Sequence, residues 1–68
     1  MIVELNGSPS ELPEKATVAD AVAKLGVDGE SRGIAVAVDG EIVRRAEWDR
    51  AGLREGQTVE VVQAVQGG

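Results

Sequence analysis

Two dipeptides, Asn6-Gly7 and Asp39-Gly40, constrain the fold of this 68-residue chain more than any other feature. Each is a strong signal for a two-residue β-hairpin turn, because both of its residues accept positive φ. Each also separates two short segments that suit β-strands. These segments are residues 1–5 and 8–12 for the first dipeptide, and 33–38 and 41–43 for the second. The sequence therefore predicts two β-hairpins, and Pro13, which has no amide donor, ends the pairing of the first.

A single short helix is predicted between the two hairpins. Thr17 suits its N-cap, Asp20 adds negative charge to its first turn, and Gly26 suits a left-handed stop after a cation at Lys24. The apolar residues at helical spacing, which we expect to be buried, are Val18, Ala21, Val22 and Leu25. Such a short helix depends on tertiary packing for its stability.

The final strand is predicted over residues 58–65, after a turn at 45–48 and a loop through 55–57. Its alternation places Val59 and Val61 toward the helix, and Val62 and Ala64 away from it. The expected fold class is α+β, with a mixed sheet of four to five strands and one helix packed across it. The first and last strands should be parallel neighbours at the sheet centre. We expect one domain over residues 1–65 and a flexible tail over 66–68.

The composition excludes several functions. The net charge of −5 disfavours nucleic acid and anionic membrane surfaces as partners. The chain has no Cys and no His, so it lacks a thiolate nucleophile and the commonest general base and metal ligand. We therefore expect no metal site. No apolar run approaches membrane-spanning length and no signal peptide opens the chain, so the default compartment is the cytoplasm.

Intrinsic catalysis is not expected. The hydroxyl groups have no His to activate them, and each is explained by a turn, a cap or strand propensity; they belong to Ser8, Ser10, Ser31, Thr17 and Thr58. The carboxylates lie at turns and on outer faces, in a chain too short to build a deep cleft around them. The prediction is a protein that is not an enzyme and binds no cofactor of its own.

Gly67-Gly68 directly follows the predicted last strand. Two glycines contribute nothing to order, so the simplest interpretation is a frayed end. The alternative is a tail without Cβ atoms that enters a narrow channel of a partner and presents its carboxylate there. The order of elements before the tail favours this second interpretation.

The chain as a whole resembles the ubiquitin-like β-grasp family, and most closely the sulfur carriers of bacterial thiamin thiazole biosynthesis. The similar segments are the first strand with Asn6-Gly7, residues 35–43, Arg45-Ala46-Glu47-Trp48, residues 53–57, and residues 59–68 with the terminal Gly-Gly. The Arg-x-x-Trp segment and the Gly-Gly end discriminate best.

The resemblance implies a function for the Gly67-Gly68 end. An adenylating, E1-like enzyme would use MgATP to activate the carboxylate of Gly68. A persulfide donor would then displace AMP, and the resulting thiocarboxylate would deliver sulfur to a thiazole synthase. Val65 and Gln66 would enter the partner's channel with the glycines, and Val62 and Ala64 would contact the partner's surface.

Other interpretations stay open from the sequence. Val62 and Ala64 are equally well explained as scattered surface apolar residues. Trp48 is expected to be a lid over the thin core rather than an interface anchor. Arg44 and Arg45 are expected to form a solvated charge pair rather than to contact acidic residues of a partner. The sulfur acceptor could instead be molybdopterin, tRNA or another metabolite. The chain could also be a ubiquitin-like modifier joined to lysines, or an interaction module with an inert tail.

Overall fold

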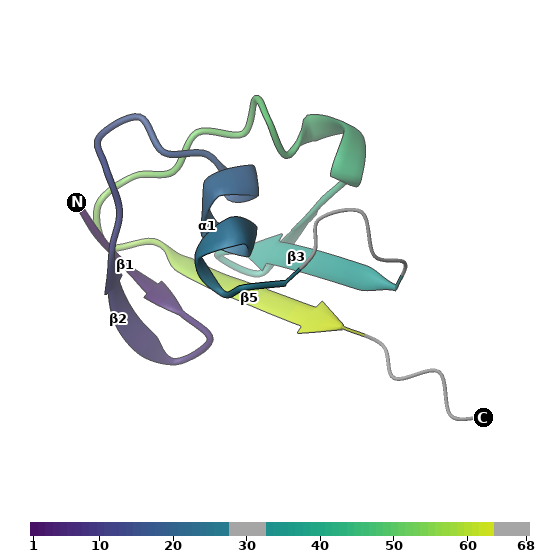
Figure 1. Cartoon of the computed structure of the whole chain (residues 1–68), viewed down its shortest axis with the longest axis horizontal. Coiled ribbons are helices and arrows are strands. Elements are labelled where there is room, and N and C mark those ends of the chain that lie inside the picture. Colours follow the sequence, from purple (N-terminus) through teal and green to yellow (C-terminus); the bar gives the residue numbers. More distant parts are fainter. Residues whose placement is uncertain (28–32, 64–68) are drawn as a thin grey trace.

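The computed structural model describes residues 1–27 and 33–63, which form a five-stranded sheet with one α-helix across one face (Figure 1). The sheet order is β2-β1-β5-β3-β4. The elements are β1 (Ile2–Leu5), β2 (Ser8–Glu11), α1 (Val18–Lys24), β3 (Ile34–Val38), β4 (Glu41–Val43), a 3₁₀ turn η1 (Arg45–Glu47) and β5 (Thr58–Gln63). The predicted α+β architecture is confirmed, with five strands.

Both predicted hairpins are present. Asn6 and Gly7 have φ of 50° and 84°, and Asp39 and Gly40 have φ of 50° and 86°. Positive φ at both central residues is the signature of the type I′ turn, whose twist matches that of the flanking strands. The two-residue turns fix the registers, with Leu5 opposite Ser8 and Val38 opposite Glu41.

β5 lies at the centre of the sheet beside β1 and parallel to it, as predicted, and it is antiparallel to β3 on its other side (Figure 1). The amides of Glu4 and Asn6 donate to the carbonyls of Gln57 and Val59, each at 2.9 Å. The described part of β5 ends at Gln63. The predicted strand continued to residue 65, and residues 64 and 65 lie outside the described residues.

The helix begins at the predicted cap. The Thr17 hydroxyl accepts the Asp20 amide at 3.4 Å, and the Asp20 carboxylate accepts the Thr17 amide at 2.8 Å, which forms a capping box. Gly26 follows the helix with φ of 76°.

The prediction that Leu25 belongs to the buried stripe is wrong, because its side chain is 37% exposed. The helix ends at Lys24, and Leu25 is its C-cap, where the apolar periodicity no longer positions a side chain over the sheet.

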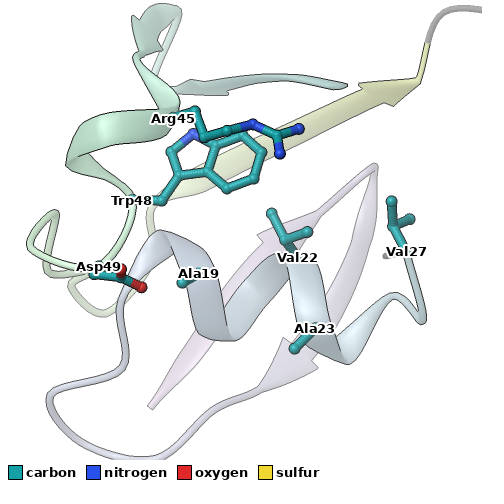
Figure 2. Close-up of a pocket in the computed structure, with 7 residues that line it drawn as sticks. All are labelled: Ala19, Val22, Ala23, Val27, Arg45, Trp48 and Asp49. Carbon is teal, nitrogen blue, oxygen red and sulfur yellow. The ribbon is translucent and has the colours of Figure 1, made fainter. Parts of the chain in front are cut away.

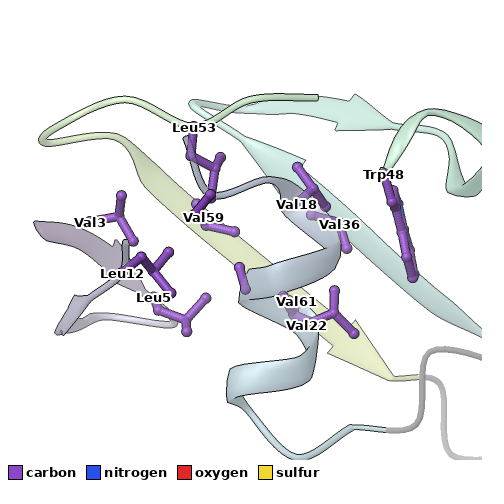
Figure 3. Close-up of a cluster of buried hydrophobic side chains, with 12 residues drawn as sticks. Val3, Leu5, Leu12, Val18, Val22, Val36, Trp48, Leu53, Val59 and Val61 are labelled. Atoms are coloured by element: carbon purple, nitrogen blue, oxygen red, sulfur yellow. The ribbon is translucent and has the colours of Figure 1, made fainter. Parts of the chain in front are cut away.

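The core lies between α1 and the sheet (Figure 3). Val59 and Val61 of β5 are buried facing the helix, and Ile34, Val36 and Val38 of β3 contact the core, as expected from strand alternation. The buried residues are Val3, Leu5, Leu12, Ala16, Val18, Ala21, Val22, Val36, Trp48, Leu53, Val59 and Val61. Among the described residues, no polar or charged residue is buried.

The segment after β4 closes the core at the edge of the helix. The amide of Val18 donates to Ala51 at 3.0 Å, and the amide of Leu53 donates to Ala16 at 2.8 Å. These bonds hold the segment that carries Trp48 and Leu53 against the start of α1. No helix within residues 1–27 and 33–63 has the length and hydropathy of a membrane span.

Candidate functional site

The candidate site begins at the end of β5, because this strand leads to the residues predicted to carry the chemistry. Hydrogen bonding alternates along β5: Val59 and Val61 bond toward β1, and Thr58 bonds toward the β3–β4 hairpin. β1 turns away at Asn6-Gly7, before β5 ends. On that side, the backbone groups near the end of β5 therefore need hydrogen-bond partners other than a neighbouring strand.

The Asn6 side chain supplies that substitute. Its Oδ1 accepts the Val61 amide at 2.7 Å, and its Nδ2 donates to the Val61 carbonyl at 3.2 Å. The carboxamide thus carries one acceptor and one donor in the positions that a strand backbone would occupy. The contact of the first hairpin with β5 is thereby extended from Val59 to Val61, two residues further along the strand.

The other type I′ turn holds the beginning of β5. Asp39 accepts the Thr58 amide at 3.0 Å and the Gln57 side-chain amide at 3.1 Å. These two hydrogen bonds, the first being the stronger influence, lower the pKa of the Asp39 carboxyl below its ordinary value of 3.8. The two turn residues therefore fix opposite ends of the same strand.

The face of the sheet away from the helix carries an apolar strip beside the end of β5. Val62 is 59% exposed and pairs with Ala35, while Ile42 is 71% exposed and pairs with Ala37. Because paired residues share a face, these four side chains lie on one side of the sheet. We call them the open-face strip. The prediction that Val62 faces away from the helix is confirmed.

Carboxylates border the strip. Glu60 precedes Val62 by two residues on β5, and Glu4 lies opposite Thr58, so both share the face of the strip. A shallow hollow on this side is lined by Glu4, Asn6, Gly7, Thr58, Glu60, Val61 and Val62. The face therefore combines apolar surface on β5, β3 and β4 with negative charge on β5 and β1.

Sequence reasoning missed Ile42 as part of this face. The signal was nevertheless present, because a two-residue turn at Asp39-Gly40 places Ile42 opposite Ala37. Ala37 directly follows Val36, and the strand alternation that places Val36 in the core turns Ala37 outward. The hairpin register alone would have placed Ile42 outside.

Two of the hydroxyl groups considered in the sequence have local structural partners. Thr17 caps the helix, and the Thr58 hydroxyl lies 3.5 Å from the Glu4 carboxylate. Within the described ranges, no group of three or more His, Cys, Asp or Glu residues is placed to hold a metal ion. Ser31 lies outside the described residues.

Trp48 lies on the helix side, and its predicted role as a lid is confirmed. It is 5% exposed, and its indole N–H donates to the Val43 carbonyl at 3.0 Å. The Arg45 guanidinium lies 4.9 Å from the ring centroid, a cation–π distance. Figure 2 shows both side chains beside a small hollow that is lined by Ala19, Val22, Ala23, Val27, Arg45, Trp48 and Asp49.

The sequence that forms this fold, together with its terminal segment, matches the model of a known protein family. The model of the ThiS family matches residues 3–68, nearly the whole chain. The chain belongs to the ThiS family. These proteins are ubiquitin-like β-grasp sulfur carriers, so the resemblance found in the sequence is confirmed.

Solved structures agree with membership in the ThiS family. The crystal structure of the thiamine biosynthesis protein ThiS from Geobacter metallireducens matches with a TM-score of 0.79 and 27% identity, over 100% of both chains. An NMR solution structure of a thiamine biosynthesis protein from the same organism matches with a TM-score of 0.78 and 27% identity, over 100% of this chain and 88% of that one. No curated protein sequence matches the chain.

The predicted site residues of this ThiS-family chain fall into two groups. Val62 lies on the open face, directly after the core residue Val61, whose backbone bonds the Asn6 side chain. The others lie outside the described residues: Ala64, Val65, Gln66, Gly67 and Gly68. The domain boundary expected at residues 65 and 66 lies there too.

Proposed function

We propose that this chain is the sulfur carrier of thiamin thiazole biosynthesis, with the carboxylate of Gly68 as the site of sulfur attachment. The observation that carries the proposal is the match to the thiamine biosynthesis protein ThiS over the full length of both chains. The position of β5 supports it, because the strand that leads to Gly68 is the best-anchored strand of the sheet.

The chemistry requires activation, because a carboxylate is a poor electrophile. On an adenylating partner, the Gly68 carboxylate attacks the α-phosphorus of ATP, and pyrophosphate leaves with Mg²⁺. The terminal sulfur of a persulfide then attacks the acyl carbon, and AMP leaves. A thiol reduces the resulting acyl disulfide, so that the S–S bond breaks and a thiocarboxylate stays on Gly68. This group donates its sulfur to a thiazole synthase.

The chain itself acts as a carrier and not as a catalyst. Every bond-making step uses groups of the partners, and the chain supplies the reacting terminus and the surface that docks it. We assign the glycines Gly67 and Gly68, with Val65 and Gln66, to the partner's channel. Because the activation consumes ATP, we place these steps in the cytoplasm.

We assign docking to the open-face strip, together with Ala64. Exposed Val62 and Ile42 give the strip apolar area next to the end of β5. Glu4 and Glu60 border it, so a partner surface with an apolar centre and basic edges is complementary. The buried Trp48 contributes to stability and not to docking.

The proposal is tested by the intact mass of the chain after incubation with an adenylating enzyme, MgATP and a persulfide donor. The expected change is the replacement of one oxygen by sulfur, localised to Gly68. A variant that lacks Gly67 and Gly68 should fold and show no change. If a partner set that is active on another carrier leaves the mass unchanged, the proposal is wrong. Covalent attachment to lysines would instead identify a protein modifier.

A further inference from the structure

The hydrogen bonds of Asn6 assign it a role that its place in a turn does not require. A type I′ turn needs positive φ at its first central residue, and glycine meets that need as well as asparagine does. The Asn6 side chain additionally spans 55 residues of sequence to bond both backbone groups of Val61. No contact within the turn itself requires this side chain.

Val61 is the position where β5 loses its neighbour on one side. Before it, Val59 accepts the Asn6 amide at 2.9 Å, so the main chain of the first hairpin still pairs with β5. After it, Val62 and Gln63 are paired with Ala35 and Ile34 of β3 alone. Strand ends with few hydrogen bonds open more readily than strand centres. Within residues 1–27 and 33–63, the Asn6 side chain is therefore the last link between β5 and the first hairpin.

The end of β5 sets the point from which residues 64–68 begin. Five residues span at most about 17 Å, so the strand end must lie within that distance of the adenylating site when Gly68 reacts. A strand end that opens away from the sheet adds conformations that must be lost before the Gly68 carboxylate is held at near-contact distance from its reaction partner. This additional ordering cost lowers the rate.

We propose that Asn6 is a positioning residue for sulfur loading. It fixes the end of β5, so that the segment ending in Gly68 starts from a fixed point on the docked sheet when its carboxylate enters the adenylating site. This inference rests on the function proposed above. Asn6 acts through Val61 and does not touch the reacting atoms. The residue lies beside the hollow on the open face, so a contact with the partner is the competing explanation.

Asp39 provides a matched control. It has the same φ of 50° in the same turn type, and its side chain also holds β5, but at Thr58, the end away from Gly68. Asn6→Gly and Asp39→Gly both keep positive φ accessible, and each removes two side-chain hydrogen bonds. Asn6 loses both bonds to Val61, and Asp39 loses one bond to Thr58 and one to the side chain of Gln57, directly before β5. They differ in which end of the strand they release.

The first measurement is amide hydrogen exchange of the free protein, which needs no partner. Asn6→Gly should raise exchange at the Val61 amide by about tenfold relative to Asp39→Gly, which should raise it at Thr58. Asn6→Asp should lie between wild type and Asn6→Gly, because it keeps an acceptor for the Val61 amide but turns a carboxylate toward the Val61 carbonyl. Unchanged exchange at Val61 in Asn6→Gly overturns the proposal.

The second measurement is the steady-state rate of thiocarboxylate formation. Asn6→Gly should lower kcat by about tenfold with KM within about twofold of wild type, while Asp39→Gly should leave both near wild type. A raised KM with unchanged kcat identifies a docking contact and contradicts positioning. If wild type forms no thiocarboxylate, the proposed function fails, while the exchange measurement still decides whether Asn6 fixes the strand end.

Discussion

Trp48→Phe tests whether the tryptophan acts as a lid on the core. The substitution removes the hydrogen bond from the indole N–H to the Val43 carbonyl, whose net contribution is about 1 kcal/mol. The smaller ring also loses apolar contact worth about one methylene group or slightly more, or about 1 kcal/mol. Since Trp48 is nearly fully buried, neither loss is discounted for exposure. The expected decrease in the free energy of unfolding is about 2 kcal/mol.

Trp48→Ala should cost about 3–5 kcal/mol, because it leaves a cavity in addition to the lost contacts. A domain of this length has a total stability of roughly 3–10 kcal/mol, so this variant should be largely unfolded or close to it. In a domain of this size, a loss of 1 kcal/mol lowers Tm by about 4–8 °C, so Trp48→Phe should melt roughly 8–16 °C below wild type.

Far-ultraviolet circular dichroism during urea and thermal unfolding is the suitable assay, since these variants lack the chain's single tryptophan. Ile42→Ala is the control, because Ile42 is exposed and its loss should change stability by less than about 0.5 kcal/mol. A cost below about 0.5 kcal/mol for Trp48→Ala would refute the assignment of Trp48 to the core.

Three further predictions concern the cap, the acidic turn and the open face. Thr17→Ala should lower stability by about 1 kcal/mol in urea unfolding, because the Asp20 amide loses its acceptor; an unchanged midpoint contradicts the capping box. The lowered pKa of Asp39 stabilises the fold above the ordinary carboxyl pKa of 3.8, and this contribution is lost as pH falls through the folded pKa. The stability difference between wild type and Asp39→Asn should therefore shrink between about pH 5 and about pH 2, and a constant difference would argue against it. Val62→Asp should weaken binding to the adenylating partner by about tenfold or more in titration calorimetry. The control Ile2→Asp should have little effect, because Ile2 is exposed on the same face but lies far from the end of β5. Equal losses of affinity in the two variants would show that docking does not centre on the strip.

Local sequence signals predicted most of the fold because they set geometry over short distances. The dipeptides Asn6-Gly7 and Asp39-Gly40 specify both turn type and register, and Thr17 with Asp20 specifies the helix start. Alternation then assigned Val62 to the outer face. Leu25 was misassigned because the apolar periodicity does not show at which residue the helix ends, and Leu25 lies just beyond that end.

The remaining features depend on contacts between distant parts of the chain. Asn6 is readable from sequence as a turn residue, but its bonds to Val61 require the register of two parallel strands that no turn connects. The same holds for Asp39 and Thr58, which meet only because the β3–β4 turn lies beside the start of β5. Long-range register is set by packing of the whole sheet, which no local window contains.

Transfer of labelled sulfur from the chain to the thiazole product is the most direct test of the central claim. The chain is loaded with isotopically labelled sulfur by its adenylating partner, purified, and mixed with thiazole synthase and the other thiazole precursors for a single turnover. We predict that the label leaves Gly68 and appears in the thiazole in an amount equal to the carrier consumed. Thiazole that forms without label, or label that stays on the chain while thiazole forms, would contradict the assignment of this protein as the sulfur carrier.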